Sequence, residues 1–207
     1  MRRVAQPAIG DAALRPLVRQ NGMAASDPYP TSARSPTGQL ACLSAPALRG
    51  RLAEEINRAG RHGTALSCLL VTIGNLEELA REHGNELSEQ TLAYVASALA
   101  SQVRGFDRVG RPSDSELLLV LPGADGPRGE IVARRVLERL RTIKVESDGM
   151  RRPLRISVGL AQWQDDIGGD DLLERVRSAA RRGNGADGAS TLASSSPPVL
   201  GRPHGPA

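Results

Sequence analysis

Apolar side chains recur through the middle of the chain with two different periods. Spacings of three and four residues predict five helices. Their ranges are 44–59, 76–82, 86–102, 127–143 and 170–182. Apolar, strand-like runs lie between them at 65–73, 106–110, 116–121, 144–147 and 153–163. This order predicts an α+β domain in which helices flank a central, largely antiparallel sheet.

Two hairpins are expected within that domain. The first joins the strands at 106–110 and 116–121, and the second joins those at 144–147 and 153–163 around Asp148-Gly149, a favoured turn pair. At the start of the domain, Ser44 suits a helix cap, and Pro46 suits the first helical turn.

The two ends of the chain have a different composition. Residues 1–43 are rich in Pro, Ala, Ser and Arg, and residues 185–207 are rich in Gly, Ser and Pro. Such segments have little apolar surface to bury. We therefore expect a disordered basic arm over 1–43, one folded domain over 44–184 and a disordered tail over 185–207.

Charge and cysteine content narrow the function classes. Residues 1–40 hold five Arg and two Asp, so they contribute +3 of the net charge of +4. The rest of the chain carries about +1, which is too little positive charge to indicate nucleic-acid binding. Cys42 and Cys68 have no metal-ligand spacing. No segment reaches the roughly 18 apolar residues that a membrane-spanning helix needs. We expect a cytoplasmic protein with no membrane span.

One stretch carries a recognisable motif. It reads Arg104-Gly105-Phe106-Asp107, then Arg111-Pro112-Ser113-Asp114-Ser115-Glu116-Leu117, then an apolar run closed by Pro122-Gly123. It resembles the signature hairpin of the GGDEF, or diguanylate cyclase, family, in which Arg-x-x-Asp precedes Gly-Gly-Asp-Glu-Phe and a buried strand. The resemblance covers roughly residues 44–184 and implies the palm-like nucleotide cyclase fold.

The resemblance also implies that the catalytic signature has degenerated. The family's metal-binding Asp falls on Thr72, and its acidic third signature position falls on Ser115, whereas Glu116 keeps the fourth. Its guanine-reading residues fall on Ala80 and Glu89. Because Mg²⁺ sites for phosphoryl transfer depend on carboxylates, we expect no catalytic residues, no metal and no cofactor, and no cyclase activity.

The Arg-x-x-Asp motif is retained, and the resemblance implies a cyclic di-GMP site there. Its expected residues are Arg104 and Asp107, with Arg135 from the following helix as the best placed of three candidates; Arg134 and Arg139 are the others. A guanidinium can bond the O6 and N7 of guanine, and a carboxylate can accept from its N–H donors. We expect both motif side chains to face the ligand and Phe106 to anchor the strand in the core. The alternative is a surface ion pair worth little.

These observations lead to one hypothesis and one alternative. The chain is similar to a degenerate bacterial GGDEF domain, and we expect a catalytically inactive cyclic di-GMP receptor that signals to an unidentified protein partner. No nucleic acid is expected as a partner, and a homodimer is left open. The alternative is a pseudoenzyme that binds no nucleotide and serves as an interaction or scaffold module.

Overall fold

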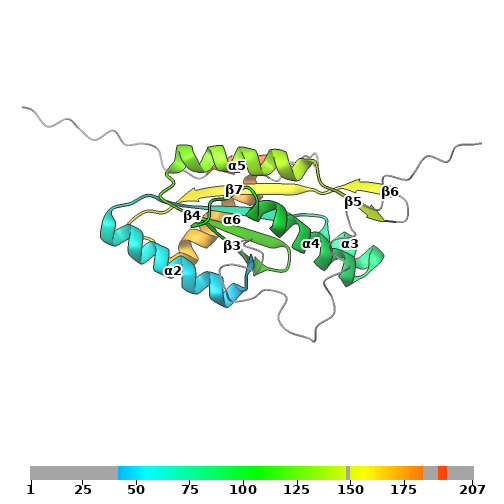
Figure 1. The fold of residues 1–207 in the computed structure, drawn as a ribbon, viewed down its shortest axis with the longest axis horizontal. Helices are drawn as coiled ribbons and strands as arrows, with labels where there is room; N and C mark the ends of the chain where they lie inside the picture. The colour runs from blue at the N-terminus through cyan, green and yellow to red at the C-terminus, as the bar shows by residue number, and fades with distance from the viewer. Residues whose placement is uncertain (1–41, 148–149, 184–190, 195–207) are drawn as a thin grey trace, which may run out of the picture.

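The computed structural model describes residues 42–147, 150–183 and 191–194 (Figure 1). Its helices are α2 (Ala45–His62), α3 (Leu76–His83), α4 (Asn85–Ala100), α5 (Gly126–Arg141) and α6 (Gly169–Gly183). Its strands are β1 (Cys42–Leu43), β2 (Leu66–Ile73), β3 (Arg108–Ser113), β4 (Glu116–Pro122), β5 (Lys144–Ser147), β6 (Met150–Pro153), β7 (Ile156–Gln162) and β8 (Thr191–Ser194).

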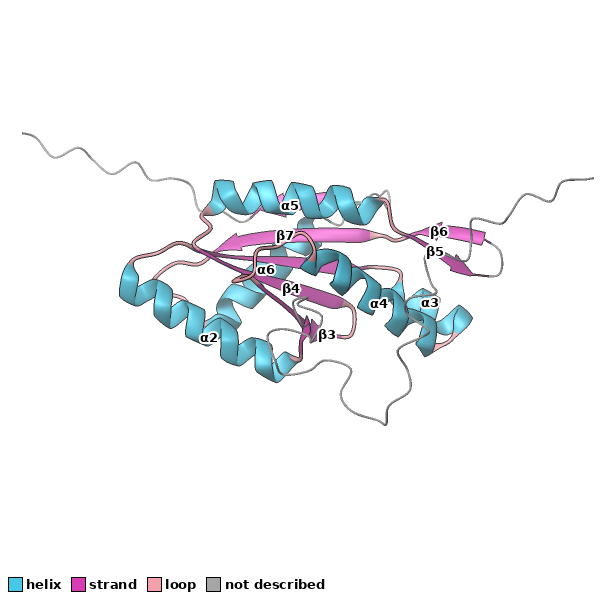
Figure 2. Ribbon diagram, in the orientation of Figure 1, coloured by secondary structure: helices cyan, strands magenta, loops and turns pink. Residues whose placement is uncertain are grey.

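Six of the strands form one mixed sheet in the order β1-β3-β4-β2-β7-β8. Figure 2 labels β3, β4 and β7 of this sheet, with helices on either side. The inner pairs β3–β4, β4–β2 and β2–β7 are antiparallel, whereas the edge pairs β1–β3 and β7–β8 are parallel. Strands β5 and β6 form a separate two-stranded sheet. The α+β architecture expected from the sequence is therefore confirmed, with a sheet that is mixed at its edges.

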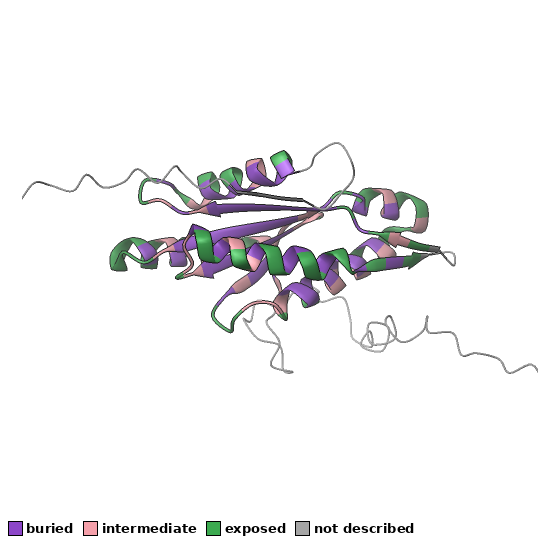
Figure 3. Ribbon diagram, turned by 90° about the horizontal axis from the view of Figure 1, so that it is seen from above, coloured by how far each residue is buried: buried purple, intermediate pink, exposed green. Residues whose placement is uncertain are grey.

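Helices cover both faces of the large sheet, so the molecule has three layers and two apolar cores. Alternate residues of β2 point to opposite faces. Leu69 and Val71 pack with α3, α4 and α5 on one face, and Cys68 and Leu70 pack with α2 and α6 on the other. Figure 3 shows the buried strands between helices whose outward surfaces are exposed. Because β2 is buried on both faces, it reads as a nearly continuous apolar run.

Two predicted boundaries need correction. Helix α2 continues through Gly60 to His62, and Gly63 follows it with a φ of 58°, a left-handed conformation that glycine adopts without strain. Strand β3 begins at Arg108 rather than at Phe106 and continues to Ser113. Residues 104–107 therefore form a turn before the strand.

The prediction of a hairpin between 144–147 and 153–163 is wrong. Strand β5 pairs with β6 instead, and β7 is a separate strand of the large sheet. The buried side chain of Asn75 holds the connection between β6 and β7. Its Nδ2 donates to the Pro153 carbonyl at 3.2 Å, and its Oδ1 accepts from the Arg155 amide at 3.0 Å. The expected turn at Asp148-Gly149 lies outside the described residues.

Both edge strands fall in segments that we expected to be disordered. Cys42 pairs with Val109, and Ser157 pairs with Thr191, each in a parallel ladder. The expectation of a structureless arm and tail is therefore wrong at β1 and β8. The rest of those two segments lies outside the described residues.

Close packing of α6 on β7 depends on Gly159. A Cβ built at this position would lie 2.3 Å from the Val176 carbonyl oxygen and 2.4 Å from the Ala180 amide nitrogen. Gly159→Ala is expected to lower the free energy of unfolding by about 1–3 kcal/mol or more, because helix and strand must separate. Urea unfolding followed by circular dichroism measures this change.

Gly50→Ala is the matched control for that prediction. A Cβ at Gly50 meets nothing within 4 Å, and the residue lies exposed in helix α2. Alanine there is expected to stabilise the protein by about 1 kcal/mol, because it favours the helix. Equal urea midpoints for Gly159→Ala and the wild type would contradict the close contact.

Candidate functional site

The β3–β4 hairpin brings the signature positions together at its tip. Ser113 and Glu116 are paired across the hairpin, and Asp114 and Ser115 form the turn between them. Glu116 also lies opposite Thr72 in the ladder between β4 and β2. The structure therefore places Thr72, Ser115 and Glu116 side by side, as the family resemblance implies.

The carboxylate of Glu116 is bonded by two side chains of the protein itself. Its Oε2 accepts from the Ser113 hydroxyl at 2.9 Å and from Nη2 of Arg177 at 2.8 Å. Nε of Arg177 lies 3.2 Å from both carboxylate oxygens. Arg177 belongs to α6, and this ion pair raises its pKa above the usual value.

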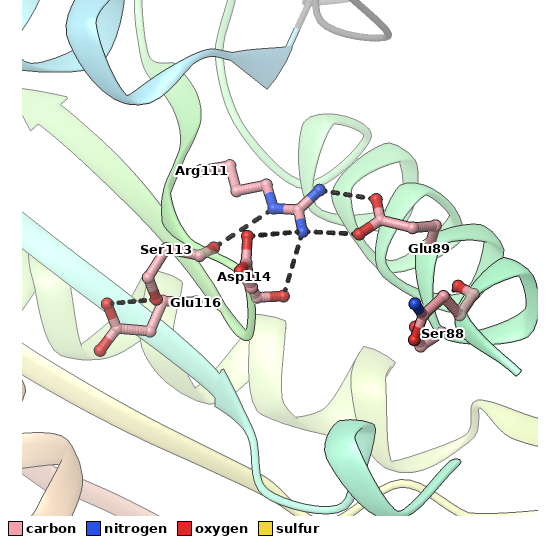
Figure 4. A network of polar contacts seen from close by, with 7 residues as sticks. Ser88, Glu89, Arg111, Ser113, Asp114 and Glu116 are labelled. Carbon is pink, nitrogen blue, oxygen red and sulfur yellow. Dashed lines mark hydrogen bonds and ion pairs between the residues drawn. The ribbon is translucent and has the colours of Figure 1, made fainter. Parts of the chain in front are cut away.

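A second arginine ties the hairpin to helix α4 (Figure 4). The guanidinium of Arg111 bonds both carboxylate oxygens of Glu89, at 2.7 and 2.8 Å, and reaches the Asp114 carboxylate at 3.2 Å. The hydrogen bonds from Arg111 hold the pKa of Glu89 below its usual value. Glu89, which falls where the family reads guanine, is therefore already paired.

The divalent-ion site that the family resemblance implies does not fit these residues. Thr72 and Ser115 offer neutral hydroxyls, and Glu116 is bonded to a guanidinium. Within 42–147, 150–183 and 191–194, no group of three or more His, Cys, Asp or Glu side chains could hold a metal ion. One paired carboxylate cannot organise the ions that phosphoryl transfer requires.

The retained Arg-x-x-Asp motif forms a closed turn. The Asp107 amide donates to the Arg104 carbonyl at 3.0 Å, and the Arg104 amide donates to Oδ2 of Asp107 at 2.7 Å. Asp107 is only 5% exposed, and burial raises the pKa of its carboxyl above the usual value, although Arg104, Arg108 and Arg135 oppose that shift. Its carboxylate therefore holds the turn instead of facing solvent.

The Arg104 and Phe106 side chains lie on the outside of this turn. The guanidinium carbon of Arg104 lies 5.8 Å from the centre of the Phe106 ring, and Phe106 is 50% exposed. The expectation that Phe106 anchors the core is wrong, because it assumed a regular strand and the alternation of side chains does not hold in a turn. The binding of a ligand by Arg104 and Asp107 stays a prediction, and the Asp107 carboxylate is bonded to the Arg104 backbone amide within the turn.

Arg135 of α5 lies beside the same turn. Its Nη2 donates to the Gln102 carbonyl, and its charge acts on the Asp107 carboxylate. Arg134, an alternative, is highly exposed and pairs with Glu130 on its own helix at 3.7 Å. Three of the predicted site residues, Arg104, Asp107 and Arg135, thus gather around one short loop.

The fold and this hairpin define a cyclase-type α+β domain. The profile of the family described as "Diguanylate cyclase, GGDEF domain" matches residues 46–186, which is more than half of the chain. The chain therefore belongs to the GGDEF family.

Curated relatives are similar over part of their own length. DosC, a diguanylate cyclase of Escherichia coli K12, is 28% identical over 134 residues, covering 62% of this chain and 29% of DosC. YdaK, named an uncharacterized membrane protein of Bacillus subtilis, is 27% identical over 128 residues, covering 61% of this chain and 45% of YdaK. The chain thus spans less than half the length of these relatives.

Solved structures share the same fold. The diguanylate cyclase SiaD of Pseudomonas aeruginosa, solved with its activator SiaC, is 25% identical with a TM-score of 0.65, over 73% of this chain and 58% of SiaD. The GGDEF domain of DgcB from Caulobacter crescentus, solved with c-di-GMP, is 17% identical with a TM-score of 0.65, over 72% of this chain and 90% of that one. None of the helices described here is long and apolar enough to cross a bilayer.

Sequence reasoning missed the role of Arg177 at this site. Its partner Glu116 is 61 residues away, and no local spacing connects them. Arg111 and Asp114 also have Arg-x-x-Asp spacing, and their side chains are in contact at 3.2 Å. Four-residue patterns thus found local contacts but not the pairing between α6 and the hairpin.

Asp107→Asn is expected to keep the turn, because an amide oxygen can accept the Arg104 N–H as the carboxylate does. Burial raises the pKa of Asp107, so the fold favours the neutral form, and wild-type stability falls as pH rises from the ordinary carboxyl pKa through the raised one. The asparagine side chain does not ionise, so the variant does not lose stability as the pH rises. It should therefore be at least as stable as the wild type at neutral pH, with an advantage that shrinks as pH is lowered.

Urea unfolding at neutral pH and near the ordinary carboxyl pKa measures both effects. Asp107→Ala is the matched comparison, because it removes the acceptor for the Arg104 amide and should be the less stable of the two variants. A clear loss of stability in Asp107→Asn at neutral pH would refute this account of the turn.

Proposed function

We propose that this GGDEF domain is a non-catalytic receptor for cyclic di-GMP that binds at Arg104, Asp107 and Arg135. The supporting observation is the gathering of these residues at the turn before β3, with the side chains of Arg104 and Arg135 exposed. The ligand itself is suggested by the family and by the c-di-GMP in the DgcB structure.

The chemistry of the loop suits a guanine nucleotide with phosphodiester charges. Arginine binds guanine edges and phosphates with paired donors, and it stacks on purine faces. Phe106, half exposed beside Arg104, offers an aromatic surface on which a base can stack. Asp107 is assigned a positioning role, because its carboxylate holds the backbone amide of Arg104.

We also propose that the domain makes no cyclic di-GMP. Joining two guanosine triphosphates requires divalent ions that gather phosphate oxygens. Thr72 and Ser115 replace the expected acidic ligands, and Glu116 is bonded to Arg177. We therefore do not assign the diguanylate cyclase activity of its relatives to this chain. We keep the expectation that the protein is cytoplasmic.

A second candidate is a nucleotide-free module that binds a protein partner. The burial of Asp107 favours it, because that carboxylate is not displayed toward a ligand. Phe106 and Ile131 favour it as well, since they are the large hydrophobic residues left exposed in the described part of the chain. SiaD, with its activator SiaC, is a relative that carries a protein partner.

Isothermal titration with cyclic di-GMP distinguishes the two candidates. The receptor proposal expects saturable binding at micromolar ligand, with Arg104→Ala and Arg135→Ala each weakening it about tenfold to a hundredfold, because each loses charge-assisted hydrogen bonds worth about 1.5–3 kcal/mol. Asp107→Asn should weaken binding less than either, since the turn is kept.

Arg81→Ala is the matched control, because Arg81 is an exposed arginine on α3. It should bind as the wild type does, and circular dichroism should show that every variant is folded. The absence of saturable binding by the wild type, or equal affinity in Arg104→Ala, would replace the receptor with the interaction module.

Incubation with GTP and Mg²⁺ or Mn²⁺, followed by chromatography, tests the proposed inactivity. We expect no cyclic di-GMP above a buffer control, because the acidic ligands are missing at Thr72 and Ser115. Product formed by the wild type and abolished in Glu116→Ala would show that the domain is an enzyme.

A further inference from the structure

Glu116, Thr72 and Ser157 form a row across three strands. Glu116 of β4 lies opposite Thr72 of β2, and Thr72 lies opposite Ser157 of β7. Directly opposite residues share a face of the sheet. The neighbouring core residues Leu70 and Leu118 show that this face is the one covered by α2 and α6.

Arg177 reaches this row from α6. The helix lies close against β7, with Val176 and Ala180 almost fully buried at Gly159. The guanidinium meets the Glu116 carboxylate at the β4 end of the row, with side-chain exposures of 29% and 15% for the two residues. The pair is therefore partly shielded from water and held by a tightly packed helix.

The charges at this place balance without any added ion. One carboxylate and one guanidinium sum to zero, and the hydroxyls of Thr72 and Ser113 are neutral. A divalent cation at Glu116 would compete with the bonds from Arg177 and would lie beside a permanent positive charge. Arginine suits such a role, because it stays protonated and bonds a carboxylate through two nitrogens.

We propose that Arg177 is the permanent counter-cation of the hairpin, standing where the family resemblance implies a metal ion. The wild-type hairpin consequently binds no divalent cation at Glu116, and its stability does not depend on one. Without Arg177, the uncompensated Glu116 carboxylate, together with the Ser113 hydroxyl, becomes a weak site for a divalent cation. This inference does not depend on the proposed cyclic di-GMP site.

The test compares unfolding of the full chain in EDTA and in millimolar Mn²⁺, with Mn²⁺ binding read directly by electron paramagnetic resonance. The wild type should show the same melting temperature in both conditions. Arg177→Ala should lower the folding equilibrium constant about tenfold in EDTA, because a partly buried carboxylate loses its charged partner. Mn²⁺ should bind to this variant and raise its melting temperature, and adding Glu116→Gln should abolish both responses.

Arg181→Ala is the matched control from the next turn of α6, because Arg181 pairs with Glu174 where both side chains are well exposed. It should change stability little and show no response to Mn²⁺. Should Arg177→Ala fail to fold, Arg177→Gln carries the same expectations with smaller loss of packing.

Three outcomes would overturn the proposal. The first is Mn²⁺ binding by the wild type that Glu116→Gln removes, which would mean that the guanidinium does not exclude the ion. The second is unchanged stability of Arg177→Ala in EDTA. The third is a folded Arg177→Ala or Arg177→Gln variant that binds no more Mn²⁺ than Arg181→Ala.

Discussion

Burial of β2 on both faces is the constraint on which the rest of the structure depends. The strand contributes alternate residues to two separate cores and lies between β4 and β7, so a shift of one residue would move each apolar side chain into the wrong core. That register places Thr72 beside Glu116 and Ser157. It also leaves the tip of the β3–β4 hairpin between helices on opposite faces, α4 on one and α6 on the other, where Arg111 and Arg177 secure it.

Strong periodicity explains what the sequence predicted. The five helices and the inner strands β2, β4 and β7 carry enough apolar residues to be recognised locally, and the family resemblance pointed to Thr72, Ser115 and Glu116 as parts of one site. The short strands β1 and β8 were not predicted from the sequence. They pair over only two and four residues, and their partners lie far away in the sequence. The direction of the Phe106 side chain in the 104–107 turn was also predicted incorrectly. There the hydrogen bond from the Arg104 amide to Asp107, rather than strand alternation, decides what faces inward.

Two carboxylates near the hairpin are paired with arginines of the same chain. Glu89 and Glu116 are each bonded by an arginine of the same chain, through two or more contacts. Carboxylates that serve metal or nucleotide chemistry must keep lone pairs available, whereas paired ones contribute to rigidity. The hairpin therefore links the two helical layers of the domain, and the exposed Arg104 lies at the other end of β3.

The edge strands β1 and β8, each paired in parallel with its neighbour, define how the sheet would respond to tension. Strand β1 lies at one edge of the sheet and β8 at the other, with five strand spacings of about 4.8 Å, or roughly 24 Å, between them. Tension applied between β1 and β8 would act perpendicular to the strands, on the hydrogen bonds of the five strand pairs in series. The β1 ladder joins only Cys42 to Val109 and Leu43 to Gly110, so it would peel away first and leave the antiparallel centre of the sheet intact.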